Sequence, residues 1–343
     1  MNIRKLLKDH LTESITAVIF LILLLFPVFT QKTYIITILV MTVYTASCSL
    51  AWSILGGQLG KVSLGHAAFG AVGAYIGMFM VDKLGISPWI AMIVAFLAVG
   101  SIMAMLMYPC FNLKGAYFSL STIAFGEAFR NLFTNWNAVG GAQGVKLPMV
   151  KKSGESLWML AFHMSNKTAY FYVGLFLLIV FYLILKWLDG SRLGYAFKTI
   201  REDEGTAQAI GIRPVRYQVI ATFISTGMVA MMGVFYACYI RYINPDLMMQ
   251  SKSLEFVLPT VIGGISTVEG PVIGAMIIVP LSEWLNGWLG SMFPGLNLLI
   301  YSLILIIVVL FRPSGILGWF KERQQKRLIE TEKKAMNLNE MEV

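Results

Sequence analysis

The sequence has few charged side chains. Asp, Glu, Lys and Arg make up 13% of its 343 residues, hydrophobic residues make up 57%, and the mean hydropathy is +0.71. A soluble domain carries about 25% charged residues. This chain therefore lacks the surface charge of a water-soluble protein of its length. The scarcity predicts an all-α fold class, a polytopic bundle of transmembrane helices.

Cysteine and histidine are equally scarce. The three cysteines lie far apart inside apolar runs, at Cys48, Cys110 and Cys238. Their spacing fits neither a disulfide framework nor a metal site, so we expect them to pack as small hydrophobic side chains. The three histidines have no acidic or thiol partners at ligand spacing. We therefore expect no metal site and no cofactor.

A nucleotide-binding loop and a catalytic constellation are also missing. The nearest approach to a phosphate loop is GGQLGKVS at 56–63. A Walker A loop needs four residues between its glycines and Ser or Thr directly after the lysine. Here Gly56 and Gly60 enclose three residues, and Val62 follows Lys61. No Ser, His and acid combination of a hydrolase is recognisable, so we expect this chain not to be an enzyme.

Long apolar runs are what the sequence does contain. A membrane-spanning helix needs about 20 apolar residues to cover about 30 Å of hydrocarbon. Nine runs qualify, at 14–30, 33–55, 66–81, 88–109, 116–133, 168–187, 217–240, 271–290 and 296–311, and a tenth, shorter run covers 254–267. No small-residue cleavage site follows the first run, so we expect it to be a retained helix rather than a signal peptide.

The basic residues predict the topology. Lys and Arg concentrate in cytoplasmic loops, and here they cluster in the N-terminal arm, in 186–216 and in the tail from 312. If all three clusters are cytoplasmic, the number of crossings is even, so the short run 254–267 must cross as well. This gives ten spans with both termini in the cytoplasm. The outer loop 134–167 carries four lysines against this assignment, but long loops carry less weight in the rule.

These assignments divide the chain into an N-terminal arm (1–13), a transmembrane domain (14–312) and a charged cytoplasmic tail (313–343). The transmembrane domain contains the outer loop 134–167 and a cytoplasmic loop, 188–216. The net charge of +9 comes from residues that flank the spans. It favours contact with anionic lipid and gives no sign of a nucleic-acid partner.

The shortest run is the one that we expect nearest to a transport route. Its 14 residues rise only about 21 Å as a helix, and it contains Pro259, Gly263 and Gly264. Interrupted segments are tolerated in a membrane only where protein or a water-filled cavity covers their backbone. We therefore expect 254–267 in the interior of the bundle.

Small residues crowd the stretch 56–77, GGQLGKVSLGHAAFGAVGAYIG. Glycine and alanine at spacings of three and four let helices approach closely in lipid. The stretch predicts a thin helix after a glycine-rich break. Such a helix could line a translocation path, or its small residues could serve ordinary helix packing alone.

Intramembrane charge is concentrated in 115–145. Glu127 and Arg130 lie three residues apart, which places them on one helix face, near the expected outer end of a span. They could pin two helices together, or contact substrate or a soluble partner at the outer face. A proton- or sodium-driven carrier usually shows more ionisable residues at mid-membrane.

The polar stretch 191–218 predicts a short helix from Asp203 to Ile210. Asp203 and Glu204 favour its N-terminal end, Gly211 is placed to stop it, and Pro214 follows. An isolated helix of about two turns is marginal in water. We therefore expect this one to dock into another protein rather than to form a solvated loop.

Five motifs together resemble one family. They are GG followed by SLGHAAFxAxGAY within 56–75, YFxxxTxAFGExxR at 117–130, GGAQGV at 140–145, SRLGYAFKTIREDEGTAQAIGI at 191–212 and IGGISTVEGPVIGA at 262–275. In this order and spacing they resemble the LivM-type permease subunits of bacterial ABC importers for branched-chain amino acids. The resemblance covers about 40–320. The chain departs from the family pattern at Val139 and Ala142, where Thr and Pro are usual, and at Ser266, where Gly is usual.

The resemblance implies a set of partners in the bacterial cytoplasmic (inner) membrane. Such a subunit pairs with a second, homologous permease, two cytoplasmic ATPases and a periplasmic substrate-binding protein. The short helix would then be the coupling helix that docks on an ATPase, with the expected coupling residues Arg201, Glu202, Asp203, Glu204, Gly205, Ala209 and Gly211. The candidates for the translocation path are Gly65, His66, Phe69, Gly70, Gly73, Phe125, Glu127, Pro259, Gly263 and Gly264.

The implied substrate is a branched-chain or related hydrophobic amino acid, which a path rich in Gly, Ala, Phe and Met would pass without tight binding. Relatives in the same family import urea, short amides or sugars, so these substrates stay open. A stand-alone channel or secondary carrier is an alternative of another class, which would transport without an ATPase. A structural membrane subunit without any pathway is a third possibility.

Overall fold

The computed structural model describes residues 20–27, 29, 32–146 and 167–289, with 303, 306, 315, 317 and 318. The N-terminal arm 1–13 and residues 147–166 of the expected outer loop lie outside these ranges. So do most of the predicted span 296–311 and most of the tail 313–343. The helical run 20–27 falls within the predicted first span.

Long helices follow the apolar runs. They are α2 (Thr33–Ser53), α3 (His66–Asp82), α4 (Pro88–Leu106), α5 (Ala116–Asn135), α6 (Lys167–Gly190), α9 (Pro214–Ile240), α10 (Gln250–Gly264) and α11 (Gly270–Leu289). Among the residues that the structure describes, four stretches are long and apolar enough to cross a membrane: Thr33–Gln58, Pro88–Leu106, Lys167–Gly190 and Pro214–Ile240. The all-α class is confirmed, whereas the count of ten spans and the side of the two termini stay predictions.

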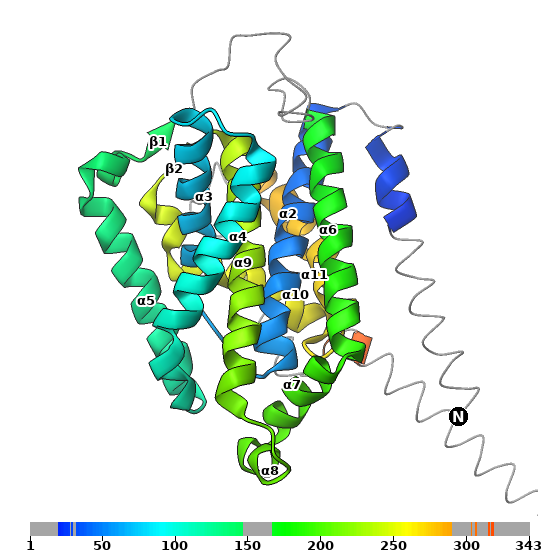
Figure 1. Ribbon diagram of the computed structural model, residues 1–343. Helices are drawn as coiled ribbons and strands as arrows, with labels where there is room; N and C mark the ends of the chain where they lie inside the picture. The colour runs from blue at the N-terminus through cyan, green and yellow to red at the C-terminus, as the bar shows by residue number, and fades with distance from the viewer. Residues whose placement is uncertain are drawn as a thin grey trace, which may run out of the picture.

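Helix α9 is the centre of the bundle (Figure 1). It packs most extensively against α3 and α4, and small residues bring the backbones together. A Cβ atom at Gly73 would meet the backbone of Ala230, and one at Gly233 would meet the carbonyl group of Gly70. Contact of this kind is how helices associate in lipid, where there is no hydrophobic force between them. The stretch 66–77 thus owes much of its small-residue content to packing on α9.

One end of the bundle carries a two-stranded ribbon. Strand β1 (Val145–Lys146) pairs antiparallel with β2 (Tyr242–Ile243), and η6 (Pro245–Met248) leads from β2 to α10. At this end Arg130 donates to the Glu127 carboxylate over 3.0 Å, and its guanidinium lies 3.7 Å from the Asp246 carboxylate. The predicted Glu127–Arg130 pair is therefore a link between α5 and the connection from α9 to α10.

Two helices beyond α6 form the opposite end, α7 (Arg192–Glu202) and α8 (Glu204–Ala209) (Figure 1). The short helix expected at 203–210 is thereby confirmed as α8. The sequence-based prediction missed α7. Its apolar residues Ala196 and Phe197 are buried, as is Ile200 one helical turn later. The Ser191 hydroxyl accepts a bond of 3.3 Å from the Gly194 N–H at the start of the helix.

Helix α10 corrects the expected course of the shortest run. The helix begins four residues before the predicted run and continues through Pro259 without interruption to Gly264. Its Gly263 faces the carbonyl of Gly270, and a Cβ at Gly274 would meet the carbonyl of Pro259. This close packing on α11 holds the proline-containing helix together. At 15 residues, α10 rises about 22 Å, less than a hydrocarbon core.

The α3–α9 contact predicts which glycines carry the fold. Gly233→Val would place side-chain atoms against the backbone of α3 and force the helices apart, at a cost of about 1–3 kcal/mol. The expected result is a lower thermal midpoint of the purified chain in detergent. Gly190→Ala is the matched control, since a Cβ there meets nothing within 4 Å. Equal midpoints for the two variants would contradict this packing.

Candidate functional site

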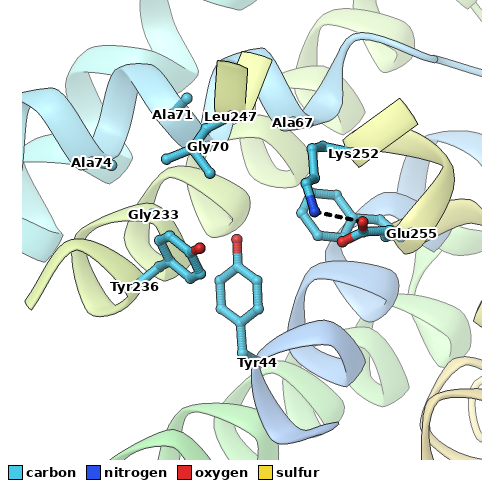
Figure 2. Close-up of a pocket in the computed structure, with 11 residues that line it drawn as sticks. Tyr44, Ala67, Gly70, Ala71, Ala74, Gly233, Tyr236, Leu247, Lys252 and Glu255 are labelled. Carbon is cyan, nitrogen blue, oxygen red and sulfur yellow. Dashed lines mark hydrogen bonds and ion pairs between the residues drawn. The ribbon is translucent and has the colours of Figure 1, made fainter. Parts of the chain in front are cut away.

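A hollow opens between helices that are far apart in the sequence. It is lined by Tyr44 of α2, by Ala67, Gly70, Ala71 and Ala74 of α3, by Gly233 and Tyr236 of α9, by Leu247, and by Lys252, Glu255 and Phe256 of α10 (Figure 2). Tyr44 is the twelfth of the 26 residues in the span Thr33–Gln58. The hollow therefore lies near the middle of that helix rather than at its end.

Small side chains make the wall that α3 contributes. Ala67, Gly70, Ala71 and Ala74 follow one another at spacings of three, one and three, so they share one helix face. The hollow is narrow: it offers about 50 Å³ to the centres of water-sized molecules. One water molecule needs about 10–15 Å³ measured in this way. The thin face of α3 thus borders a space for a few water molecules.

The opposite wall is polar. The rings of Tyr44 and Tyr236 lie 5.1 Å apart between centroids, and the Lys252 Nζ lies 2.7 Å from Glu255 Oε1. Both charged side chains line the hollow, and they are 46% and 43% exposed. Ionisable residues within a membrane bundle are costly and are retained mainly for function. This pair marks the hollow as the leading site in the described part of the chain.

The structure brings only some of the predicted path residues to this hollow. Gly70 lines it. Gly73 lies against α9, whereas Gly65, at the start of α3, faces the carbonyl of Thr122 on α5. The side chain of Phe69 is completely buried in the core. These four residues belong to α3 or its start, yet only Gly70 lies at the hollow, and the other three pack against neighbouring helices or in the core.

His66 is held in a buried network instead of the hollow. Its Nδ1 lies 2.9 Å from the Ser63 hydroxyl, and its Nε2 lies 2.8 Å from the Ser225 hydroxyl. Ser225 donates its own proton to the carbonyl of Ala51 over 2.7 Å. It must therefore accept from His66 Nε2, which leaves Nδ1 to accept from Ser63. Both ring nitrogens are satisfied, so packing and hydrogen bonding account for this histidine.

The remaining path candidates lie on α5 and α10. Phe125 and Glu127 are partly buried on α5, and Glu127 is engaged with Arg130. Pro259, Gly263 and Gly264 are buried on α10, where Pro259 and Gly263 contact α11. None of these five is among the residues that line the hollow. Their part in a translocation path stays a prediction.

Sequence reasoning missed the polar wall. Lys252 and Glu255 stand three apart at the start of α10, immediately around the point where the apolar run was taken to begin. A charged pair at helical spacing that leads directly into a buried stretch was the available signal. Tyr44 and Tyr236 carried no signal of their own, because tyrosine is common in apolar helices.

The second group of predicted residues surrounds α8. Asp203 caps this helix, since its carboxylate accepts a bond of 2.6 Å from the Thr206 N–H, and this bond holds the pKa of Asp203 below its usual value. Gly211 ends the helix region with a φ of +86°. Gly205 and Ala209 are exposed on α8, as are Arg201, Glu202 and Asp203 before it, while Glu204 is partly buried.

A groove runs between α7 and α8. It is lined by Tyr195, Lys198, Thr199, Glu202, Asp203 and Thr206. Ile210, at the end of α8, is 66% exposed. An exposed isoleucine beside exposed glycine and alanine gives this end of the bundle a small apolar tip next to charged groups, a surface suited to contact with another protein.

A buried ion pair joins α8 to the bundle. The Lys61 Nζ lies 2.8 Å from the Glu204 carboxylate, and it also donates to the carbonyls of Phe111 and Leu113 over 3.3 and 2.9 Å. Lys61 is only 9% exposed. Five residues later the chain enters α3. The position of α8 is thus tied to the segment that leads into the wall of the hollow.

Arg201 makes the corresponding link from α7. Its guanidinium donates to the carbonyl of Gly57 over 2.8 Å and to the Ser266 hydroxyl over 3.0 Å. Gly57 belongs to the π-helical end of α2 (η1, Ile54–Gln58), and Ser266 lies between α10 and α11. The α7–α8 pair therefore contacts extensions of α2, α3 and α10, three of the four helices that border the hollow.

Metal binding has no support in the part of the chain that the structure describes. No group of three or more His, Cys, Asp or Glu side chains there is placed to hold an ion.

The family model and the curated relatives that match this chain all belong to branched-chain amino acid transport systems. A family model described as "Branched-chain amino acid transport system / permease component" matches residues 34–309. The chain is 24% identical over 323 residues to the high-affinity branched-chain amino acid transport permease LivM of Escherichia coli K12, covering 84% of this chain and 75% of that protein. It is 23% identical over 291 residues to LivH of Salmonella typhimurium, covering 80% and 91%. No solved structure matches the chain.

The Lys61–Glu204 pair predicts a large effect of neutralising its buried cation. Lys61→Met would remove the cation from the Glu204 carboxylate, which would keep only the Gln218 amide as a donor, and would take the Lys61 donor from two carbonyls. This should destabilise the chain by about 2–3 kcal/mol. The thermal midpoint in detergent measures this. Lys83→Met is the control, because its pair with Asp82 spans 3.6 Å and its side chain is 68% exposed. If Lys61→Met were as harmless as the control, the link would not hold α8.

Proposed function

This chain belongs to the family of permease components of branched-chain amino acid transport systems, and on that premise we propose that it is the membrane-spanning subunit of an ABC importer. With a second, homologous permease it would form the translocation path for branched-chain or related hydrophobic amino acids. The observation that carries the proposal is the family match over 34–309, which includes both the hollow and the α7–α8 region.

The route would pass through the hollow. Four of its lining residues are Gly or Ala of α3, so a solute can come close to the helix backbone. The half-buried Tyr44 and Tyr236 and the charged pair on α10 face this wall. A partner permease would close the open side of the hollow, since a path between two such subunits needs a wall from each.

The energy would come from ATPase subunits through α8. Its exposed Gly205 and Ala209 and the exposed Ile210 offer the surface for docking, beside the groove lined by Glu202 and Asp203. Movement of α8 would reach α3 through Lys61 and would reach α2 and α10 through Arg201. For ATP to drive the change, the ATPase must contact α8 differently in the two states of the permease.

The orientation follows from the same proposal. The end of the bundle with α7 and α8 would lie in the cytoplasm, where ATP is available, and the ribbon of β1 and β2 would lie on the periplasmic side of a bacterial inner membrane. A soluble substrate-binding protein would deliver the amino acid there. Ten spans with both termini in the cytoplasm fit this orientation, and 134–167 would be the periplasmic loop.

The alternatives make different predictions. A permease for urea, short amides or sugars would share the architecture and differ in the solute that its binding protein delivers. A stand-alone channel or secondary carrier would transport without ATPase subunits and would have no need of α8. None of the relatives described above bears a name of these kinds, and LivM and LivH are both named for branched-chain amino acid transport.

The docking role of α8 predicts a specific defect. Ala209→Arg would place a large cation on the exposed apolar tip without touching the buried face of α8, which Ala207 provides. The expected result is loss of about 90% of ATPase association, since a charge placed at the core of an interface typically costs 2 kcal/mol or more, roughly thirtyfold in affinity. Co-purification of the ATPase with the permease pair measures it.

The matched control is Gly190→Arg, which adds the same side chain at an exposed position at the end of α6, outside α8. It should leave association unchanged. Normal ATPase association and uptake with Ala209→Arg would mean that α8 is not the docking site.

A further inference from the structure

We propose that Lys252 and Glu255 form a binding site for the zwitterionic head group of the transported amino acid. The α-carboxylate would contact the Lys252 ammonium, and the α-ammonium would contact the Glu255 carboxylate. The inference rests on the proposed function and adds the chemical class of ligand and the residues that recognise it. Binding would replace the ion pair between Lys252 and Glu255 by two ion pairs with the ligand, and it involves no covalent step.

The geometry of the pair fits this exchange. Lys252 and Glu255 stand three apart on α10, so they project from one helix face, and their charged atoms are 2.7 Å apart. On the surface of a soluble helix such a pair would be ordinary and weak. Here both side chains line the hollow, and they are 46% and 43% exposed. Ionisable residues inside a membrane bundle are costly and typically mark the path of a substrate or an ion.

An α-amino acid presents the complementary arrangement. Its ammonium and carboxylate groups are attached to the same carbon, so both can reach two opposite charges that are already neighbours. When the zwitterion enters, each charge of the pair gains a counter-charge and the net charge of the hollow stays zero. A lone buried charge would pair with one end of the zwitterion and leave the other end without a counter-charge, which is costly away from water.

The opposite wall suits the side chain. Gly70, Ala71 and Ala74 leave space next to the α3 backbone, and Leu247 and Phe256 add apolar surface. Figure 2 shows the Tyr44 hydroxyl pointing into the space between this wall and the charged pair. A ligand with its head group at Lys252 and Glu255 would thus direct an apolar side chain toward α3.

Neutral solutes would bind this site less well. Urea, short amides and sugars carry no full charge, so they would separate Lys252 from Glu255 without replacing either interaction. A site built around charged groups rejects analogues that leave those groups unpaired. The charged pair therefore selects for zwitterions independently of the binding protein.

The test uses the complete importer, with partner permease, ATPases and leucine-loaded binding protein, in proteoliposomes that contain ATP. The variants are Lys252→Met, Glu255→Gln and the charge exchange Lys252→Glu with Glu255→Lys. Each single variant should lower the initial rate of leucine uptake about tenfold or more, because one end of the zwitterion loses its partner. ATPase stimulation by the binding protein should stay within about twofold. The charge exchange keeps both charges in the hollow and should restore uptake to within about threefold of wild type.

Asp82→Asn is the control, since Asp82 belongs to an ion pair at the far end of α3 and should leave uptake unchanged. Two outcomes would overturn the inference: normal uptake in the single variants, or an equal fall of uptake and ATPase stimulation that the charge exchange does not restore. The second outcome would give the pair a structural role only. If the wild-type complex failed to import leucine, the proposed function itself would be wrong, and the variants would not be needed to show it.

Discussion

The close backbone contact between α3 and α9 is the constraint on which the rest of the bundle depends. Gly73 lies against Ala230 and Gly233 lies against Gly70, so neither helix can carry larger side chains on this face. The same short side chains continue around α3 to Ala67, Ala71 and Ala74. One run of small residues therefore fixes α3 on the central helix and borders the hollow beside this contact.

Two groups of charged side chains matter most for the proposed transport. Lys61, almost completely buried, holds α8 through Glu204, while Arg201 holds the ends of α2 and α10. Lys252 and Glu255 face the hollow that these helices border. In a chain with only 13% charged residues, one group of charges connects the α7–α8 end to the helices, and the other is the group that we propose meets the solute.

Hydropathy predicted most helices well, since a run of apolar residues is the strongest signal a chain can give. The capping signals of Asp203 and Gly211 predicted α8 equally well. Helix α7 was missed because its buried turn, Ala196 to Ile200, is short and flanked by charges.

The site residues were harder to predict than the helices. The path candidates His66 and Phe69 are buried among their neighbours, because a sequence shows that a helix carries small residues and does not show which of its faces a neighbouring helix covers. Lys252 and Glu255 were missed because their significance comes from the hollow that α2, α3 and α9 build around them.

The most direct measurement is leucine uptake into proteoliposomes by this chain reconstituted alone, with the second permease, and with the second permease, both ATPases and the binding protein. An importer subunit driven through α8 should give ATP-dependent accumulation only in the complete assembly, and none when ATP is replaced by a non-hydrolysable analogue. Accumulation or rapid exchange of leucine by this chain alone, without nucleotide, would contradict an ABC permease and would identify a channel or secondary carrier instead.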